Sequence, residues 1–208
     1  MIISRKAAGS FLGLLLGLII ALAVFTAYMD TGAAVPDTLG DPIQSNLSQV
    51  KTMDYAVDQG IVKLDLLAEY KIDAVVKGIK SYHNDGPGSA SPMDFILIWG
   101  DLNQPEVNKV IHYSQFNRWY HFTVSDVARI SVSEVSRHSA NTHMIPADEG
   151  VLKILKHVKK EDYVSMEGYL VRVYMKDSRD SGIASSLTRE DTGAGACEVF
   201  YVAKIKIL

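Results

Sequence analysis

The stretch that decides the fold is PADEGVLKILKHVKKEDYVSMEGYLVRVYM, residues 146–175. Its first half begins with Pro146 and Asp148, which favour the start of a helix, and continues with apolar residues at the helical spacing. Its second half, Tyr163–Met175, predicts a long strand. Gly168 lies inside this strand, and a glycine at such a position often marks a bulge or the bend of a barrel.

Further strands are predicted on both sides of this stretch. Upstream, Glu69–Tyr82 alternates between apolar and polar residues, and Met93–Gly100 is a short apolar run. Arg118–Val124 is rich in aromatic and β-branched residues. Downstream, Cys197–Leu208 alternates again. Three strands, a helix and two strands is the order of a five-stranded Greek-key barrel of the OB type. We therefore expect a mainly β (α+β) domain, a small OB-like barrel with one helix between strands 3 and 4. A split β-sandwich with one helix is the alternative, and the polar segment 125–143 fits the barrel poorly.

The N-terminal region predicts a membrane anchor. Residues 7–29, AAGSFLGLLLGLIIALAVFTAYM, carry no charge, and a helix of that length spans about 35 Å, enough to cross ~30 Å of hydrocarbon. Arg5 and Lys6 precede the run, and no further Lys or Arg follows until Lys51. By the positive-inside rule the N-terminus stays in the cytoplasm. A cleaved signal peptide is the alternative, but its apolar region is normally shorter.

These features divide the chain into four parts. We expect a cytoplasmic tail (1–6), a transmembrane helix (7–29), a tether (30–60) that holds a short helix, and an extracytoplasmic β-rich domain (61–208). The protein would then be a single-pass protein of the cytoplasmic (inner) membrane, with its domain in the periplasm or outside the cell.

Three glycines indicate a partner for the anchor. Gly9, Gly13 and Gly17 fall on one helix face at a spacing of four, and small residues so placed let two membrane helices approach closely. We expect a protein partner or self-association through this face.

Composition excludes several classes of protein. The 208 residues are 48% hydrophobic, which excludes a disordered chain. The net charge of −3 gives no cationic surface for phosphates, so we expect no nucleic-acid partner. Cys197 is the only cysteine, so no intramolecular disulfide can form, and we interpret it as a small buried apolar residue.

Candidate ligand-binding residues lie where an OB-type barrel binds its ligands, on its second and third strands and on the loop between its last two strands. Aromatic and Arg side chains there could recognise a peptide, a glycan or a strand-like partner, although the tryptophans could instead belong to the core. The candidates are Trp99, Arg118, Trp119, Tyr120, Arg189 and Asp191.

Catalysis is the weaker interpretation. A membrane-tethered hydrolase could use His143 with Ser186 or Asp191, but no nucleophile elbow surrounds Ser186. Asp191-Thr-Gly resembles an aspartic protease motif, which needs a second carboxylate. We favour a hydrogen-bonding clamp, in which Asn141 fixes backbone and His143 reaches a carboxylate such as Asp191. His138 and His143 with Asp148 match no standard zinc spacing, and we expect no metal and no cofactor.

Five segments resemble an uncharacterised family of bacterial proteins anchored in the inner membrane. The resemblance covers roughly residues 60–208 and implies an envelope protein, without an activity or catalytic residues. The segments are Trp99-Gly100, NRWY (117–120), NTHMIPA (141–147), GYLV (168–171) and SSLTREDTGAGACE (185–198). We therefore expect a binding or interaction domain, or a subunit of a membrane complex.

The anchor gives a first testable prediction. Membranes that contain the C-terminally tagged full chain should retain it through washes with high salt and alkaline carbonate, because about 20 apolar residues hold a protein in a bilayer. Fractionation followed by immunoblotting measures this. Release of the uncleaved chain into the carbonate supernatant would contradict the anchor.

Overall fold

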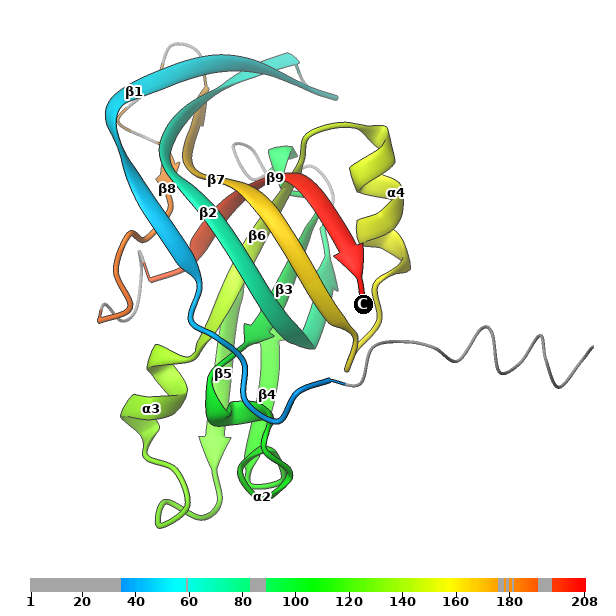
Figure 1. Cartoon of the computed structure of the whole chain (residues 1–208). Coiled ribbons are helices and arrows are strands. Elements are labelled where there is room, and N and C mark those ends of the chain that lie inside the picture. The colour runs from blue at the N-terminus through cyan, green and yellow to red at the C-terminus, as the bar shows by residue number, and fades with distance from the viewer. Residues whose placement is uncertain are drawn as a thin grey trace, which may run out of the picture. The chain divides into compact units, whose positions relative to one another are not determined.

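Five strands of the computed structural model pair in a closed ring (Figure 1). They are β2 (Gly60–Ser81), β3 (Met93–Ile98), β6 (Ser139–Pro146), β7 (Tyr163–Met175) and β9 (Glu198–Ile207). The pairings run β2–β3–β6–β9–β7 and return to β2, and all of them are antiparallel except β6 with β9. The prediction of a mainly β fold is confirmed.

The structure describes residues 35–58, 60–82, 89–175, 178, 180, 182–190 and 196–208. The predicted membrane helix (7–29), with Gly9, Gly13 and Gly17, lies outside the described residues. Among the residues that are described, no helix has both the length and the apolar character needed to cross a membrane.

Helix α4 (Glu149–His157) joins β6 to β7, as the sequence predicts. The Asp148 carboxylate accepts a hydrogen bond from the Val151 N–H at 2.9 Å and so caps the first turn. Val151 and Leu155 are buried, so α4 turns its apolar face toward the core.

The interior of the ring is filled by large apolar side chains. Phe95 and Leu97 of β3, Met144 of β6 and Phe200 of β9 are almost completely buried in one cluster. The ring of Phe200 lies edge-on to Tyr70 of β2, with 5.1 Å between ring centroids. Burial of such aromatic pairs is a main source of stability in a small β domain.

A second apolar cluster lies where the long strands extend past the ring. β1 (Ile43–Val57) pairs antiparallel with β2, and in Figure 1 β1 and the adjoining part of β2 arch together over one end of the molecule. Short β8 (Ile183–Ala184) pairs with β7. The cluster joins residues of β2, β7, β6 and β9, namely Val62, Leu64, Ile145, Val171, Val173 and Val199.

The expected tether is therefore wrong for residues 43–57, which form a strand and no helix. The polar composition of this segment suggested irregular chain. Residues 43–52 are mostly exposed and pair with β2 through the backbone. In the second half of β1, Met53, Tyr55 and Val57 alternate with exposed neighbours and pack against the second apolar cluster, but this short alternation follows a long polar segment.

The connection from β3 to β6 carries a separate two-stranded hairpin. Its elements are η2 (Asp101–Asn103), α2 (Pro105–Asn108), β4 (Ile111–Phe116), β5 (Trp119–Val124) and α3 (Val132–Arg137). β4 and β5 pair only with each other among the described strands. The turn between them places Asn117 at φ 55° and Arg118 at φ 70°, the two left-handed positions of a type I′ turn.

The prediction that Arg118–Val124 forms the third strand of the barrel is wrong. The segment Arg118–Val124 does form a strand, but it belongs to the hairpin, and the third strand of the ring is β6. Most of β6 lies in the segment 125–143 that the sequence left unassigned. Its polar Asn141, Thr142 and His143 are all buried, so no apolar pattern marks them as a strand. The helices α2 and α3 were also not predicted.

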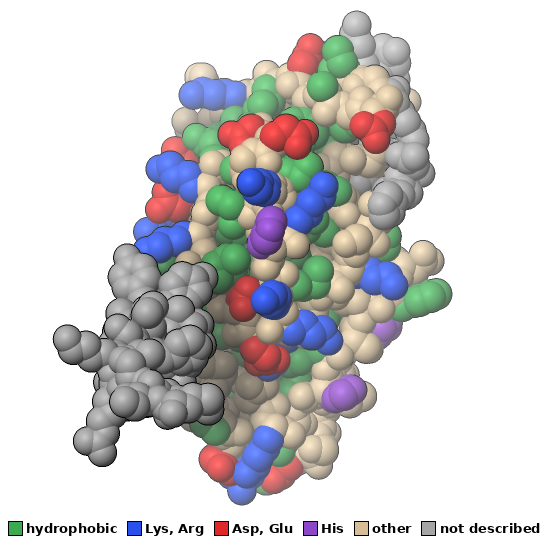
Figure 2. Space-filling view, turned by 90° about the vertical axis from the view of Figure 1, so that its right-hand side faces the viewer, with side chains coloured by type: hydrophobic (Ala, Val, Ile, Leu, Met, Phe, Trp, Pro, Cys, Tyr) green, Lys and Arg blue, Asp and Glu red, His purple; other side chains and the backbone are tan. Residues whose placement is uncertain are grey.

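One side of the molecule gives no candidate site. Figure 2 shows acidic and basic side chains mixed over this face, with hydrophobic side chains scattered between them. Mixed charges without a broad apolar area are typical of a solvated surface.

Gly168 marks a bulge, as the sequence predicts. The register between β7 and β9 shifts at Glu167/Gly168. A Cβ atom on Gly168 would lie 2.0 Å from the Tyr201 carbonyl oxygen and 2.9 Å from the Ala203 nitrogen. Both neighbours are backbone atoms, so they cannot move aside as a flexible side chain would.

We expect Gly168→Ala to lower the free energy of unfolding by about 3 kcal/mol, because added volume forces the two strands apart. Urea denaturation of the full chain in detergent, followed by tryptophan fluorescence, measures this. The control is Gly40→Ala, where a Cβ atom meets no atom within 4 Å. Equal stability of the two variants would contradict the close approach of β7 and β9.

Candidate aromatic cleft

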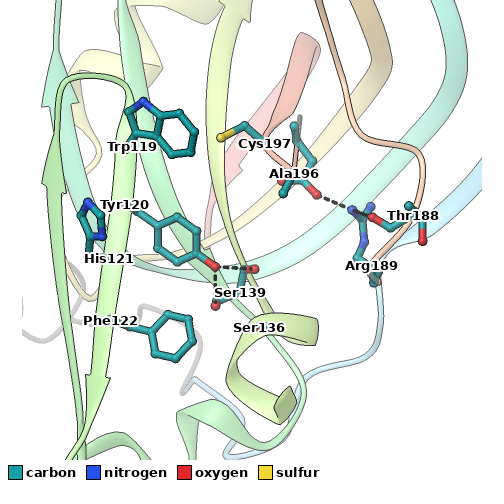
Figure 3. A pocket seen from close by; sticks show the side chains of 11 residues that line it. Trp119, Tyr120, His121, Phe122, Ser136, Ser139, Thr188, Arg189, Ala196 and Cys197 are labelled. Carbon is teal, nitrogen blue, oxygen red and sulfur yellow. Dashed lines mark hydrogen bonds and ion pairs between the residues drawn. The ribbon is translucent and has the colours of Figure 1, made fainter. Parts of the chain in front are cut away.

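A cleft of about 350 Å³ lies between β5 and the segment that leads into β9 (Figure 3). The hairpin provides one side and residues 188–189 and 196–198 the other, with α3 and β6 between them. The lining residues are Trp119, Tyr120, His121, Phe122, Ser136, Ser139, Thr188, Arg189, Ala196, Cys197 and Glu198.

Aromatic side chains of β5 form one wall. The Trp119 side chain is 43% exposed, which is high for so large an apolar residue. The Tyr120 hydroxyl lies 3.3 Å from the Ser139 carbonyl oxygen and 3.2 Å from the Ser139 Oγ atom. Burial raises the pKa of Tyr120, so its phenol stays protonated and remains a hydrogen-bond donor. In Figure 3 the side chains of Trp119, Tyr120 and Phe122 extend from β5 toward Ser139 and Cys197.

Arg189 forms much of the opposite wall and is charge-balanced. It makes an ion pair with Glu198, which is only 2% exposed. Its Nη2 atom donates to Gln44 Oε1 at 3.3 Å and to the Tyr70 hydroxyl oxygen at 3.4 Å. The guanidinium also lies 5.9 Å from the centroid of the Trp99 ring, within cation–π range. Since Glu198 neutralises Arg189, this pair adds no net charge to the cleft.

The structure brings together three of the predicted ligand-binding residues, Trp119, Tyr120 and Arg189, and separates two others. Trp99 is 1% exposed and belongs to the core, so its assignment to a ligand face is wrong. Arg118 does not line the cleft. Asp191 lies outside the described residues.

Arg118 instead fastens the hairpin to the barrel. Its Nη1 atom lies 2.7 Å from Asp94 Oδ1, and the Asp94 side chain is completely buried. Its Nη2 atom donates to the Ser91 carbonyl oxygen at 3.0 Å, and its guanidinium stacks 3.8 Å from the centroid of the Tyr82 ring. The backbone N–H of Arg118 donates to the Tyr82 hydroxyl oxygen at 2.9 Å. These contacts hold Arg118 in its left-handed conformation, which a non-glycine residue seldom adopts.

The clamp expected at Asn141 and His143 is present, but the carboxylate that His143 reaches is Asp94, whereas the suggested Asp191 lies outside the described residues. The Nδ1 atom of His143 lies 2.8 Å from Asp94 Oδ1. An ionised carboxylate only accepts hydrogen bonds, so this Nδ1 atom carries the proton. The Asn141 Nδ2 atom donates to the Arg118 carbonyl oxygen at 3.0 Å. All these groups belong to the joint between the hairpin and the barrel.

The candidate hydrolase residues have other partners. Ser186 is buried; its hydroxyl donates to the Thr188 carbonyl oxygen at 2.7 Å and accepts from the Thr188 N–H at 3.1 Å. His143 is also buried and faces Asp94. Within the described part of the chain, no three His, Cys, Asp or Glu residues are grouped to hold a metal ion.

Sequence reasoning missed several residues of the cleft. Cys197 is partly exposed and lines the cleft, which corrects its interpretation as a buried apolar residue. Ser139 and Phe122 were not singled out, and no local pattern marks them. Asp94 did leave a signal: it is the one charge in the apolar strand MDFILI, and a charge in a buried strand calls for a partner.

We expect Arg118→Ala to lower the free energy of unfolding by about 3 kcal/mol, because it leaves the buried Asp94 carboxylate without its cation. The control is Arg129→Ala, which removes a 46% exposed guanidinium paired with Glu106 and Asp126 and should cost less than about 1 kcal/mol. Urea titration of the full chain in detergent measures both. Similar losses in the two variants would argue against the clamp.

Comparisons with known proteins leave this site without a named relative. No model of a protein family matches the chain, and neither the curated proteins nor the solved structures include a significant match. The function is therefore argued from the cleft itself.

Proposed function

We propose that this chain is a single-pass envelope protein whose β-rich domain binds a ligand or partner protein outside the cytoplasmic membrane, without catalysis. The uncharged run 7–29, with Arg5 and Lys6 before it, supports the anchor and the orientation. The ligand is a peptide, a glycan or a segment of a partner protein. A place in a larger membrane complex is consistent with this role.

We also infer that the ring of strands is an OB-type barrel. The support is its connectivity: counted along the chain, the ring order is 1-2-3-5-4, the third and fifth strands (β6 and β9) are parallel, and α4 lies between the third and fourth strands. In such barrels, ligands bind on the second and third strands and at the loop between the last two. Here those parts are β3, β6 and the segment 176–197.

The hairpin covers part of this expected ligand face and leaves only its margin accessible. Gln115 donates to Asn141 at 2.9 Å and Arg118 binds Asp94, so the hairpin covers outward side chains of β3 and β6. The uncovered part is the cleft, which β5 and residues 188–189 and 196–198 border. The cleft thus occupies the margin of the expected ligand face.

One observation carries the proposal. Trp119 and Tyr120 are about 70 residues away from Arg189 in the chain, yet all three line one cleft. Exposed tryptophan, tyrosine and arginine side chains at a concave site are the groups that dominate binding energy in protein interfaces. A cleft of about 350 Å³ is also in the range of known ligand sites.

A hydrolase is not proposed. A general base must reach the proton that it removes from the nucleophile. Both side chains are buried, with His143 8% and Ser186 4% exposed, and the Ser186 hydroxyl donates its proton to the Thr188 carbonyl oxygen. This arrangement serves to fix the hairpin and the loop.

We expect Trp119→Ala to weaken binding about tenfold or more, because a tryptophan at the mouth of a binding cleft contributes a large part of the binding energy. The full chain in detergent micelles is screened against an array of synthetic peptides and an array of bacterial glycans. Dissociation constants of the hits are then measured by fluorescence titration.

The matched control is Phe116→Ala. Phe116 is 74% exposed on the same hairpin and does not line the cleft. Hits that weaken with Trp119→Ala and keep their affinity with Phe116→Ala support the cleft. The proposal would be refuted if Trp119→Ala left the affinity of the hits unchanged, or if both variants weakened it equally.

A further inference from the structure

Strand β5 has one paired edge and one open edge. It pairs with β4 along its length, from Phe116↔Trp119 at the turn to Ile111↔Val124 at the far end. Among the described strands, β5 has no second neighbour. A strand edge without a neighbour presents backbone N–H and C=O groups that can receive another strand.

The turn fixes which backbone groups face the open edge. In a two-residue hairpin, the residues that flank the turn, Phe116 and Trp119, form a hydrogen-bonded pair. Such pairs alternate with pairs that exchange no hydrogen bonds, and in those pairs the backbone groups point outward. The N–H and C=O of Tyr120 and Phe122 therefore point to the open edge. Within the described residues, these four groups have no hydrogen-bond partner.

This open edge borders the cleft. Four consecutive residues of β5, from Trp119 to Phe122, line the cleft. Successive side chains of a strand point to opposite faces, so a cleft that reaches all four runs along the strand's edge. Figure 3 shows the cleft between β5 and the labelled residues Cys197 and Arg189.

We propose that the cleft binds an extended, uncharged peptide segment, which adds to the hairpin as a third strand beside β5. This inference rests on the proposed binding function and names its ligand class. The peptide backbone exchanges hydrogen bonds with Tyr120 and Phe122. Its side chains pack on Trp119 on one side and over Ser139 and Cys197 on the other.

The spacing and the charge of the site favour a peptide over other ligands. Outward backbone groups repeat every second residue, about 6.7 Å, which is also the repeat of an extended peptide. Among the described residues that line the cleft, the ion pair of Arg189 with Glu198 leaves no net charge to attract a phosphate or a carboxylate. Main-chain hydrogen bonds supply affinity in this mode of recognition, and pockets for alternate side chains supply specificity.

The test uses a nonapeptide with blocked ends and the full chain in detergent micelles. In the peptide, a lysine that carries fluorescein on its side-chain amine precedes an uncharged segment of four threonine-valine repeats. Two further peptides carry N-methyl groups, one on all threonine amides and the other on all valine amides. We expect the unmodified peptide to bind. One methylated peptide should bind about tenfold more weakly, because it loses hydrogen bonds to β5. The other should bind as the unmodified peptide does, because its methyl groups point away from β5. Fluorescence anisotropy measures all three.

A matched pair of variants tests the protein's side. Tyr120→Ala removes the ring and keeps the backbone N–H, whereas Tyr120→Pro removes both. Because this N–H faces the open edge, proline should not break the hairpin. We expect Tyr120→Pro to bind the peptide at least fivefold more weakly than Tyr120→Ala. Buried Trp99 reports folding by its fluorescence, and if the proline variant unfolds, the methylated peptides decide alone.

Three outcomes would overturn the proposal. The first is no binding of the unmodified peptide, and the second is equal affinity of the two methylated peptides. The third is dimerisation of the full chain that Tyr120→Pro abolishes, since β5 would then pair with a second copy. If one of these results is found but a glycan binds in a way that depends on Trp119, the cleft is still a binding site and only the strand addition is refuted. If no peptide and no glycan binds in a way that depends on Trp119, both proposals are refuted.

Discussion

The buried carboxylate of Asp94 is the group on which the arrangement around the cleft depends. Its neighbours Met93 and Phe95 point into the core, so Asp94 points to the outer face of the barrel. An ionised group that is completely buried is tolerated only with charged or hydrogen-bonding partners. Asp94 has Arg118 from the hairpin and His143 from β6. The hairpin supplies the guanidinium in this set, so the position of the hairpin and the burial of the Asp94 carboxylate depend on each other.

This clamp explains how a hairpin with only two strands keeps a fixed place. An isolated two-stranded hairpin is marginally stable in water. Here Tyr113 and Phe122 pack against the core cluster, and Arg118 fixes the turn through Asp94 and Tyr82. The apolar contacts give most of the attraction, and the ion pair selects one position. A fixed hairpin holds the open edge of β5 at a constant distance from the barrel, which a binding cleft requires.

The described residues between β8 and β9 contribute a wall of the cleft and also contact the barrel core. The Arg189 guanidinium lies over the rings of Tyr70 and Trp99 and forms an ion pair with Glu198 at the start of β9. Burial and the charge of Glu198 raise the pKa of Tyr70, so its hydroxyl stays neutral beside the ion pair. The same contacts therefore attach Arg189 to the barrel core and give the cleft a wall in which its charge is paired.

Local patterns were sufficient for the elements that have one apolar face. The helix after Asp148, the strand Tyr163–Met175 and the bulge at Gly168 follow from capping, alternation and glycine placement, all of which act between near neighbours in the chain. Polar strands were harder to recognise. β6 carries buried polar residues and shows no alternation, and in β1 the alternation is confined to Met53, Tyr55 and Val57 at the end of a long polar segment.

The sequence by itself determined a mainly β chain, the capped helix, and a polar clamp at Asn141 and His143. Only the tertiary structure decided that Arg118–Val124 belongs to a separate hairpin, that Asp94 is the partner of His143, 49 residues away, and that Trp119 and Arg189 share a cleft. The physical reason is the distance along the chain over which each interaction acts. Capping and periodicity act within a few residues, whereas the choice of a partner for a buried charge or an open strand edge depends on which surfaces the closed barrel brings together.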